Sequence, residues 1–321
     1  MVNRIFSSNF AAHIEELILQ KHRLGYPYDE SERILYNFDQ FCLKLFPLEH
    51  ILTQQIGLAW AVRRETESVS TFRNRMMPVR ELARHLYRLG IEAYIIPTNI
   101  TKKAARYMPH IYTAEQLQRF FDILDQIPPK KNFPVRHFVI PVFFRLIYCC
   151  GLRPIEARKL RVEDVDLVRG CLNILESKGH KDRIVPMAED VWELCVRYHA
   201  AVRRVMPDRK WFFPTSEGTM YTKKWCEKTF RVQWAKTGIS QTGPNPPRIY
   251  DLRHSFATHR LYQWMKEGKE LTAYLPYLST YLGHAQFSDT AYYIHLVPGI
   301  FEEMAGFDFN ARGNLLPEVK E

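Results

Sequence analysis

Two segments in the middle of the chain carry basic side chains at places where the backbone turns. Residues 151–156 read Gly-Leu-Arg-Pro-Ile-Glu, so Arg153 lies between a glycine and a proline in a turn that fixes its backbone. Residues 174–186 have the pattern of a β-hairpin, with Lys178 beside a glycine that can adopt a positive φ. A lone turn arginine is usually structural, and a lysine at a hairpin tip can either reach a ligand or keep a strand edge soluble.

Two later segments add an arginine, a histidine and a pair of tyrosines. In the stretch Tyr-Asp-Leu-Arg-His-Ser-Phe-Ala-Thr-His, helical spacing places Arg253 beside an apolar face, where it could be an ordinary salt-bridge partner. In residues 282–295, His284 lies in a loop and precedes a helix that carries Tyr292 and Tyr293. Tyrosines in a helix are more often packing residues than reactive ones.

The four segments taken in order are more specific than any one of them. They read G-L-R-P-x-E, S-K-G-x-K-x-R-x-V-P, Y-D-L-R-H-S-F-A-T-H and L-G-H followed after eight residues by Y. This order resembles the catalytic domain of the tyrosine recombinase, or phage-type integrase, family. The resemblance is strong over the second domain and weak over the N-terminal residues, which would form the core-binding half of such a protein.

The resemblance implies a role for five side chains. Arg153 and Arg253 would hold the scissile phosphate, and Lys178 would protonate the leaving 5′ oxygen. His284 would donate a hydrogen bond to the phosphate, and Tyr293 would be the nucleophile. These roles agree with the chemistry of phosphoryl transfer, which needs positioning and neutralisation of charge more than a bound metal ion.

Two tyrosine positions need separate comment. In the resembled family the L-G-H histidine precedes the nucleophile by nine positions, which selects Tyr293 and leaves Tyr292 without a catalytic role. At Tyr250 the sequence departs from the family, which most often has the histidine of H-x-x-R there. A phenol can donate or accept a hydrogen bond but cannot act as an imidazole base near neutral pH. The departure puts the general-base step in doubt.

The function that the resemblance implies is site-specific DNA recombination or integration through a covalent 3′-phosphotyrosyl intermediate. The partners would be double-stranded DNA, gripped by a two-domain clamp, and further copies of the chain in a tetramer on paired DNA sites. No metal ion or other cofactor is expected. One alternative is a cleavage-deficient DNA-binding architectural or regulatory protein on the same fold, for which Tyr250 is the only hint. Another is a DNA-relaxing enzyme with the same covalent chemistry.

Composition and charge agree with a folded protein that binds a polyanion. The 321 residues include 45 Lys and Arg against 35 Asp and Glu, which gives a net charge of +10, and 46% are hydrophobic. The longest apolar stretch, residues 138–152, is interrupted by Pro141 and Arg145 and is too short for a membrane helix. With no secretory signal apparent, we expect a cytoplasmic protein.

The periodicity of apolar residues predicts two domains. Residues 1–105 should form a helical core-DNA-binding domain with a linker, because apolar residues recur there at helical spacing. Residues 106–321 should form an α+β catalytic domain with a C-terminal tail, and the pair Thr113 and Gln116 predicts a capping box near its start. Three short strands at 162–167, 171–176 and 183–187 predict a small antiparallel sheet in this mainly helical domain.

The last predicted helix of the first domain, residues 72–89, has an apolar face and a second, basic face. The basic face holds four arginines: Arg73, Arg80, Arg84 and Arg88. It could be an ordinary solvated face or could follow DNA phosphates, and the shortage of acidic residues at i+4 favours phosphates. Pro78 should kink this helix or delay its start.

A further prediction concerns the tail, where Ile300, Phe301, Met304 and Phe307 form an apolar stripe on a segment too short to be a stable helix alone. The stripe could fold back on its own domain, but in the resembled family a C-terminal segment commonly packs on a neighbouring copy, and on that resemblance we expect the stripe to dock there. Truncation after Val297 should then leave binding to a single DNA site near normal and eliminate higher-order complexes, as measured by native gels and light scattering with DNA. A truncated protein that still assembles on paired sites, or that is unfolded, would contradict this expectation.

Overall fold

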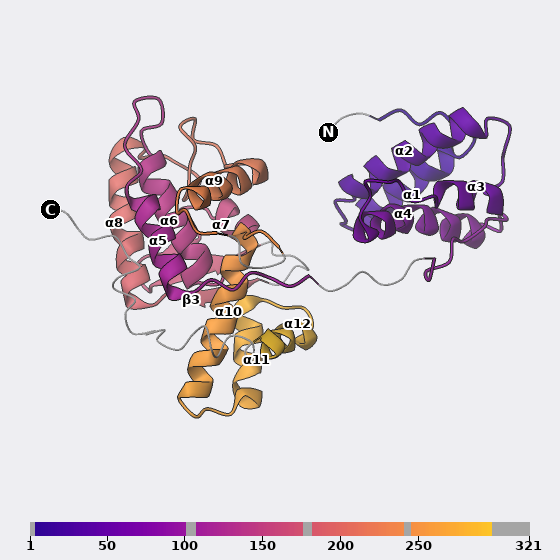
Figure 1. Cartoon of the computed structure of the whole chain (residues 1–321). Helices are drawn as coiled ribbons and strands as arrows, with labels where there is room; N and C mark the ends of the chain where they lie inside the picture. Colours follow the sequence, from indigo (N-terminus) through magenta and orange to yellow (C-terminus); the bar gives the residue numbers. More distant parts are fainter. Residues whose placement is uncertain (1–3, 101–106, 176–181, 241–244, 297–321) are drawn as a thin grey trace. The chain divides into compact units, whose positions relative to one another are not determined.

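The chain folds into two compact units, Met1–Tyr107 and Met108–Glu321 (Figure 1). The computed structural model describes residues 4–100, 107–175, 182–240 and 245–296, with the side chain of His295 left out. The predicted boundary between residues 105 and 106 falls outside the described residues, as do Lys178 and the apolar stripe of the tail. Each unit is described by itself below.

The first unit is all helical. Its helices are α1 (Ala11–Arg23), α2 (Asp29–Leu45), α3 (Gln54–Trp60) and α4 (Val69–Arg88). Helices α3 and α4 begin at Thr53 and Ser68, whose side chains accept hydrogen bonds from the free backbone N–H groups of the first turn. Apolar residues of all four helices, among them Phe38 and Met76, pack into one core.

Helix α4 passes through Pro78 without a break. It begins at Val69, so the expected late start is wrong. A proline at position 78 removes the hydrogen bond to the carbonyl of Asn74, and Asn74 is exposed, so water can satisfy that carbonyl.

The second unit is mainly helical with one small sheet, which confirms the predicted fold class. Its helices are α5 (Ala114–Asp125), α6 (Arg136–Cys149), α7 (Pro154–Lys159), α8 (Glu189–Val205), α9 (Lys223–Ala235), α10 (Ile249–Lys266), α11 (Leu271–Leu282) and α12 (Phe287–Ala291), followed by the 3₁₀ helix η1 (Tyr292–Leu296). The predicted capping box of Thr113 and Gln116 is present at the start of α5. No helix among the described residues is long and apolar enough to cross a membrane.

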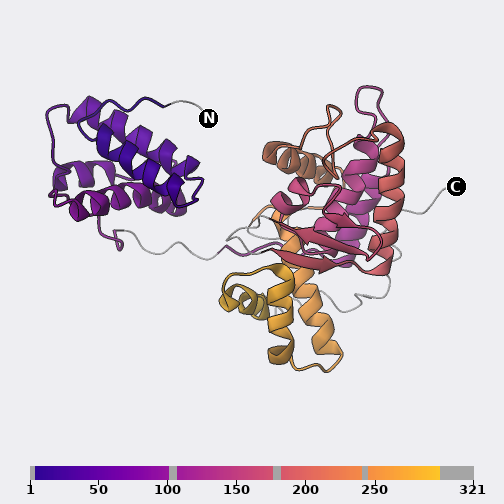
Figure 2. The same ribbon diagram turned by 180° about the vertical axis from the view of Figure 1, so that it is seen from behind.

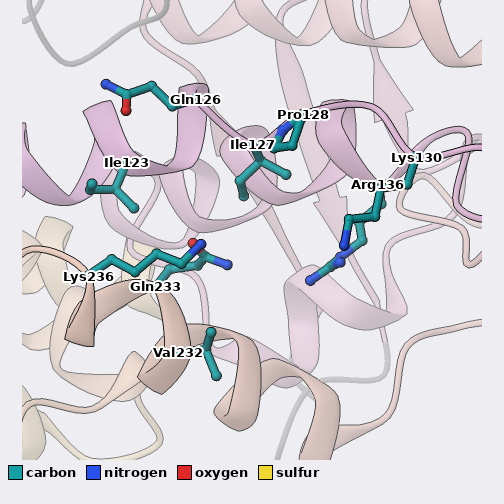
Figure 3. Close-up of a pocket in the computed structure, with 9 residues that line it drawn as sticks. All are labelled: Ile123, Gln126, Ile127, Pro128, Lys130, Arg136, Val232, Gln233 and Lys236. Carbon is teal, nitrogen blue, oxygen red and sulfur yellow. The ribbon is translucent and has the colours of Figure 1, made fainter.

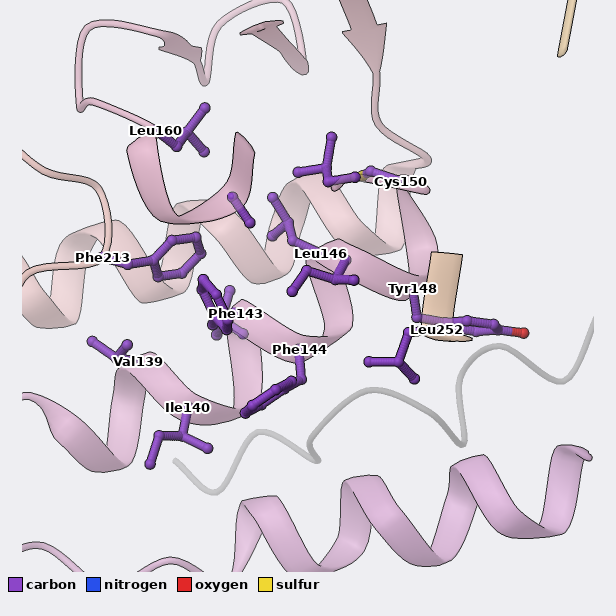
Figure 4. Close-up of a cluster of buried hydrophobic side chains, with 14 of the residues drawn as sticks. Val139, Ile140, Phe143, Phe144, Leu146, Tyr148, Cys150, Leu160, Phe213 and Leu252 are labelled. Carbon is purple, nitrogen blue, oxygen red and sulfur yellow. The ribbon is translucent and has the colours of Figure 1, made fainter. Parts of the chain in front are cut away.

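Helix α6 is the centre of the second unit, and its neighbours include α5, α7, α8 and α10. Its side chains are buried on every side, as Figure 4 shows for Phe143, Phe144 and Leu146. The one charged residue in this buried run, Arg145, donates two hydrogen bonds of 2.7 and 2.6 Å to Asp125. A helix that is apolar all round has to be covered by others, which places α6 in the interior of the unit.

The sheet is antiparallel, with the order β1 (Val165–Asp166), β2 (Cys171–Ile174), β3 (Arg183–Pro186) (Figure 2). Strand β1 is shorter than predicted because the chain turns just before it, where Asp164 accepts a hydrogen bond of 2.9 Å from the backbone N–H of Arg161. Strand β3 carries Arg183 toward α11, where its guanidinium donates to the carbonyl of Tyr281.

Candidate active site

Arg153 occupies the N-cap of α7, just after the chain leaves α6. The turn requires Gly151, which has φ +59° and whose Cβ, if present, would lie 2.5 Å from the ring of Phe256. The Arg153 guanidinium donates hydrogen bonds to Oε1 of Glu156 at 2.7 Å and to the carbonyl of Gly283 at 2.8 Å. The turn and these two contacts fix the direction of the side chain.

Arg253 lies on α10 and is only 1% exposed. Its guanidinium donates to the carbonyl oxygens of Gly151, at 2.7 Å, and Leu282, at 2.6 Å. These carbonyls lie at the C-terminal ends of α6 and α11, where the helix dipole is negative and carbonyls lack helical partners. Burial, followed by the charge of Arg153, lowers the pKa of Arg253 to about 10, which leaves it a cation at neutral pH.

Glu156 connects the basic residues of the site. Its carboxylate accepts two hydrogen bonds from Arg183, of 2.9 and 2.8 Å, and two from Arg153, from the backbone N–H at 2.8 Å and the guanidinium at 2.7 Å. It also lies 3.8 Å from the Arg253 guanidinium. Burial raises the pKa of Glu156, but the hydrogen bonds and charge of Arg183 and the charge of Arg253 outweigh it and bring the value to about 2. The carboxylate is therefore ionised and shared by three guanidiniums.

His284 follows Gly283, which has φ +65° and ends α11. Its Nδ1 is 2.7 Å from Oγ1 of Thr290 on α12, so the loop between the two helices is closed by this contact. Burial first, and then the charges of Arg253 and Arg153, lower the pKa of His284 to about 3. The imidazole is neutral at physiological pH and can donate one N–H.

Tyr293 lies on η1 and is 3% exposed. Its hydroxyl is 3.0 Å from Nδ1 of His254, and its ring stacks with that of His284 at a centroid distance of 6.1 Å. Burial raises the pKa of Tyr293 to about 12, although the charge of Arg253 opposes the shift. The adjacent Tyr292 also lies on η1 rather than on the helix that the sequence predicted.

Tyr250 lies at the edge of this cluster. It is 39% exposed and precedes His254 by one turn of α10, with the two ring centroids 5.4 Å apart. Its ring therefore lies near His254, whose Nδ1 is the atom within hydrogen-bond distance of the Tyr293 hydroxyl.

The structure thus brings together four of the predicted residues, Arg153, Arg253, His284 and Tyr293, and places Tyr250 beside them. Sequence reasoning gave no role to three further residues of the cluster: Glu156, Arg183 and His254. All three stand inside the quoted motifs. The sequence held a signal for His254, because a residue four positions after Tyr250 lies on the same face of a helix. It held no comparable signal for the contact between Glu156 and Arg183, which joins distant parts of the chain.

The predicted basic face of α4 needs a correction at Arg80. This side chain is buried, and its guanidinium donates to the carbonyls of Ile96 and Pro97, both at 2.7 Å. It fastens the chain after α4 to the helix and does not form part of an exposed face. Arg84 and Arg88 are exposed and Arg73 is half-buried.

A pocket of about 430 Å³ lies elsewhere in the second unit, between the end of α5 and α9 (Figure 3). Apolar side chains such as Ile123 and Val232 line it together with three basic residues, Lys130, Arg136 and Lys236. None of the residues of the cluster around Glu156 lines this pocket. Within the described residues, no group of three or more His, Cys, Asp or Glu side chains is placed to hold a metal ion.

Comparison with known proteins places this chain in a known family. The model of the phage integrase family matches residues 111–298. The integrase/recombinase homologue y4rB of Sinorhizobium fredii is 30% identical over 305 residues, covering 92% of this chain and 96% of its own. Tyrosine recombinase XerC of Proteus mirabilis is 30% identical over 197 residues, or 61% of this chain and 58% of the relative.

Solved structures share the fold. The XerH site-specific recombinase bound to a palindromic difH substrate has a TM-score of 0.63 at 22% identity, over 85% of this chain and 77% of that one. The Tn1549 transposon integrase in complex with transposon right end DNA has a TM-score of 0.62 at 15% identity, over 94% and 98%. The chain belongs to the phage integrase family, the tyrosine recombinases, which are DNA strand-transfer enzymes.

Replacement of Glu156 by glutamine should destabilise the second unit, because it leaves buried guanidiniums without a counter-charge. We expect the free energy of unfolding to fall by about 3–5 kcal/mol. Because the pKa of Glu156 is lowered in the folded protein to about 2, its contribution is present above pH 4.5 and is lost as pH falls toward 2. Denaturant unfolding followed between pH 6 and 3 measures both effects.

The matched control is Glu163→Gln, which removes a carboxylate that pairs with Arg161 and is 71% exposed. Its effect should stay within about 1 kcal/mol. Equal effects of the two substitutions, or an unchanged pH dependence in Glu156→Gln, would contradict the role given to Glu156.

Proposed function

We propose that this chain is a site-specific recombinase or integrase that cleaves and rejoins double-stranded DNA through a 3′-phosphotyrosyl bond on Tyr293. The observation that carries the proposal is the cluster in which Arg153 and Arg253 share the Glu156 carboxylate, while the neutral His284 stacks on Tyr293 and both couple to these two arginines by charge. The Tyr293 oxygen attacks phosphorus, the bond to the 5′ oxygen breaks, and the free 5′ hydroxyl of a second strand later reverses the step.

Arg153 and Arg253 bind the scissile phosphate in this proposal. The hydrogen bonds to protein carbonyls hold each guanidinium, and every terminal nitrogen carries a second N–H that can donate to a phosphate oxygen. Donors that are held in place before the reaction stabilise developing charge without reorganisation. His284 donates a further hydrogen bond, and Lys178, outside the described residues, protonates the leaving 5′ oxygen.

The nucleophile has to be uncovered for this reaction. Tyr293 is 3% exposed, so a DNA phosphate reaches its hydroxyl only after the surrounding chain moves. Tyr293 lies on a five-residue 3₁₀ helix, an element with weak internal hydrogen bonds that can shift at little cost. We propose that this shift of η1 occurs when DNA binds.

The first unit contributes sequence-independent contacts to DNA in this proposal. Arg84 and Arg88 are exposed on α4. Burial first, and then the charges of Arg84 and Arg73, lower the pKa of Arg80, so these cations lie close together. A local excess of positive charge of this kind favours contact with phosphates. Assembly of four copies on paired DNA sites completes the proposed reaction.

Tyr293→Phe tests the proposed nucleophile. Wild-type protein is first incubated with sheared DNA of its source organism, and covalent adducts are trapped with detergent and sequenced to find the cleaved site. On a synthetic version of that site, nicked near the scissile phosphate, Tyr293→Phe should form no adduct and bind nearly as well as wild type. The phenyl ring keeps the packing and loses only the nucleophilic oxygen.

The control is Tyr292→Phe, which should retain adduct formation. A protease-sensitive adduct in Tyr293→Phe would overturn the assignment. No adduct with wild-type protein would favour the cleavage-deficient binding protein, and cleavage that never joins two partner sites would favour a DNA-relaxing enzyme.

The exposed arginines of α4 give a second prediction. Arg84→Ala combined with Arg88→Ala should weaken binding to duplexes of any sequence. The slope of log affinity against log salt concentration should fall by about 0.9 for each lost phosphate contact. Titrations of random-sequence duplex DNA at several salt concentrations measure it. The charge-matched control is the double variant Arg23→Ala with Lys44→Ala, which removes exposed cations of α1 and α2. If the salt slope falls equally in the two double variants, the α4 arginines are an ordinary solvated surface and do not contact phosphates.

A further inference from the structure

The hydroxyl of Tyr293 has a partner to which the proposed mechanism gives no task. His254 Nδ1 lies 3.0 Å from the Tyr293 oxygen, within hydrogen-bond distance. The two residues are 39 positions apart in the sequence and meet because α10 packs against η1. If Tyr293 is the nucleophile, His254 is in direct contact with the reacting atom.

A buried phenol needs a group that takes its proton before or while it attacks phosphorus. Burial raises the pKa of Tyr293 to about 12, so the phenolate is scarce at neutral pH. Tyr250 is itself a phenol and cannot accept the proton at neutral pH. His284 stacks on the Tyr293 ring with an angle of 16° between the planes, and its Nδ1 is engaged with Thr290.

The surroundings of His254 keep it able to accept a proton. From α10 and its N-cap it faces Arg253, Tyr250 and Arg248, and from η1 it faces Tyr293. The neutral His284 lies close enough, in the loop after α11, for the two imidazoles to interact electrostatically. These groups are cationic or neutral. Burial, and then the charges of Arg253 and Arg248, lower the pKa of His254 to about 4.

A neutral His254 with its proton on Nε2 presents the Nδ1 lone pair to the Tyr293 hydroxyl. A phosphate that enters the site adds negative charge beside the ring, which favours the protonated imidazole at the moment when the proton arrives. In the free protein both pKa shifts keep the proton on Tyr293, and the negative charge of an entering phosphate opposes them, which ties the transfer to DNA binding.

We propose that His254 is the general base of DNA cleavage, receiving the Tyr293 proton at Nδ1 in place of the imidazole that position 250 lacks. This inference rests on the proposed function. The O–H bond of Tyr293 breaks as N–H forms on His254, the oxygen bonds to phosphorus, and the 5′ oxygen leaves. On rejoining, His254 returns the proton to the departing Tyr293 oxygen.

The kinetic test compares His254→Ala, His254→Asn and the wild type on the nicked synthetic site found by adduct sequencing. Asparagine keeps a hydrogen-bond acceptor near the position of Nδ1 but is not a base. Both variants should cleave about 100-fold or more slowly than wild type and bind DNA equally well. Because solvent has to remove the proton in the variants, their log rate should rise with pH between 6 and 9 far more steeply than that of wild type.

Two further variants sharpen the comparison. Tyr250→His combined with His254→Ala should recover a substantial part of the rate, because it supplies an imidazole one helical turn away. His199→Ala, a half-buried histidine of α8 that contacts Arg209, is the control and should cleave like wild type. Recovery of the cleavage rate by Tyr250→His would show that His254→Ala is slow because it lacks a base and not because its fold is disturbed.

A second measurement needs no DNA. In protein labelled with ¹⁵N-histidine, the ring nitrogen signals of His254, assigned by their loss in His254→Asn, should shift in Tyr293→Phe and stay unchanged in Tyr292→Phe. Unmoved signals in Tyr293→Phe would contradict the contact itself.

The outcomes distinguish this inference from the function on which it rests. If wild-type protein forms no adduct on any DNA, the proposed function fails. If wild type cleaves and both His254 variants cleave equally well, the general base fails alone. If His254→Asn cleaves at the wild-type rate and His254→Ala does not, His254 only positions Tyr293. If both variants cleave faster than wild type, the contact restrains the nucleophile. Either result overturns the proposal.

Discussion

One buried carboxylate holds the catalytic cluster together. Glu156 is the counter-charge for Arg153, Arg183 and Arg253, and without it these cations would be uncompensated in a region of low dielectric constant. Three guanidiniums and one carboxylate still leave a net charge of +2. This surplus suits a phosphodiester whose negative charge grows as the attacking oxygen adds, so the same ionic cluster that stabilises the unit also prepares it for an anion.

The geometry of the cluster follows from where two helices end. The last carbonyls of α6 and α11 have no partners within their helices, and Arg253 binds both ends while Arg153 binds the carbonyl of Gly283. Both ends turn through glycines with positive φ, Gly151 and Gly283, where a Cβ would collide with a neighbouring side chain. The backbone thus positions the arginines through helix termini that must be satisfied whether or not DNA is bound.

The parts of this architecture that local sequence determines could be predicted, and the parts that depend on distant contacts could not. The capping box at Thr113 and the three strands follow from neighbouring residues, and the order of four motifs pointed to the catalytic cluster. The contact of Glu156 with Arg153 is local, but its role as a shared counter-charge could not be predicted because Arg183 and Arg253 come from β3 and α10. The prediction that Arg80 belongs to the basic face was wrong for a similar reason. Its helical spacing is that of the exposed arginines, but its guanidinium is buried and donates to the carbonyls of residues 96 and 97, which follow the helix.

Helix geometry explains how a departure from the family pattern at position 250 can leave the chemistry intact. Residues 250 and 254 lie one turn apart on the same face of α10, and both stand near the nucleophile. They differ in environment, because Tyr250 is 39% exposed while His254 is half-buried and lies within hydrogen-bond distance of Tyr293. A base at 250 would exchange protons with water, whereas a base at 254 is shielded by the nucleophile's own helix. Moving the imidazole inward by one turn therefore ties proton transfer to the arrival of the phosphate rather than to the solvent.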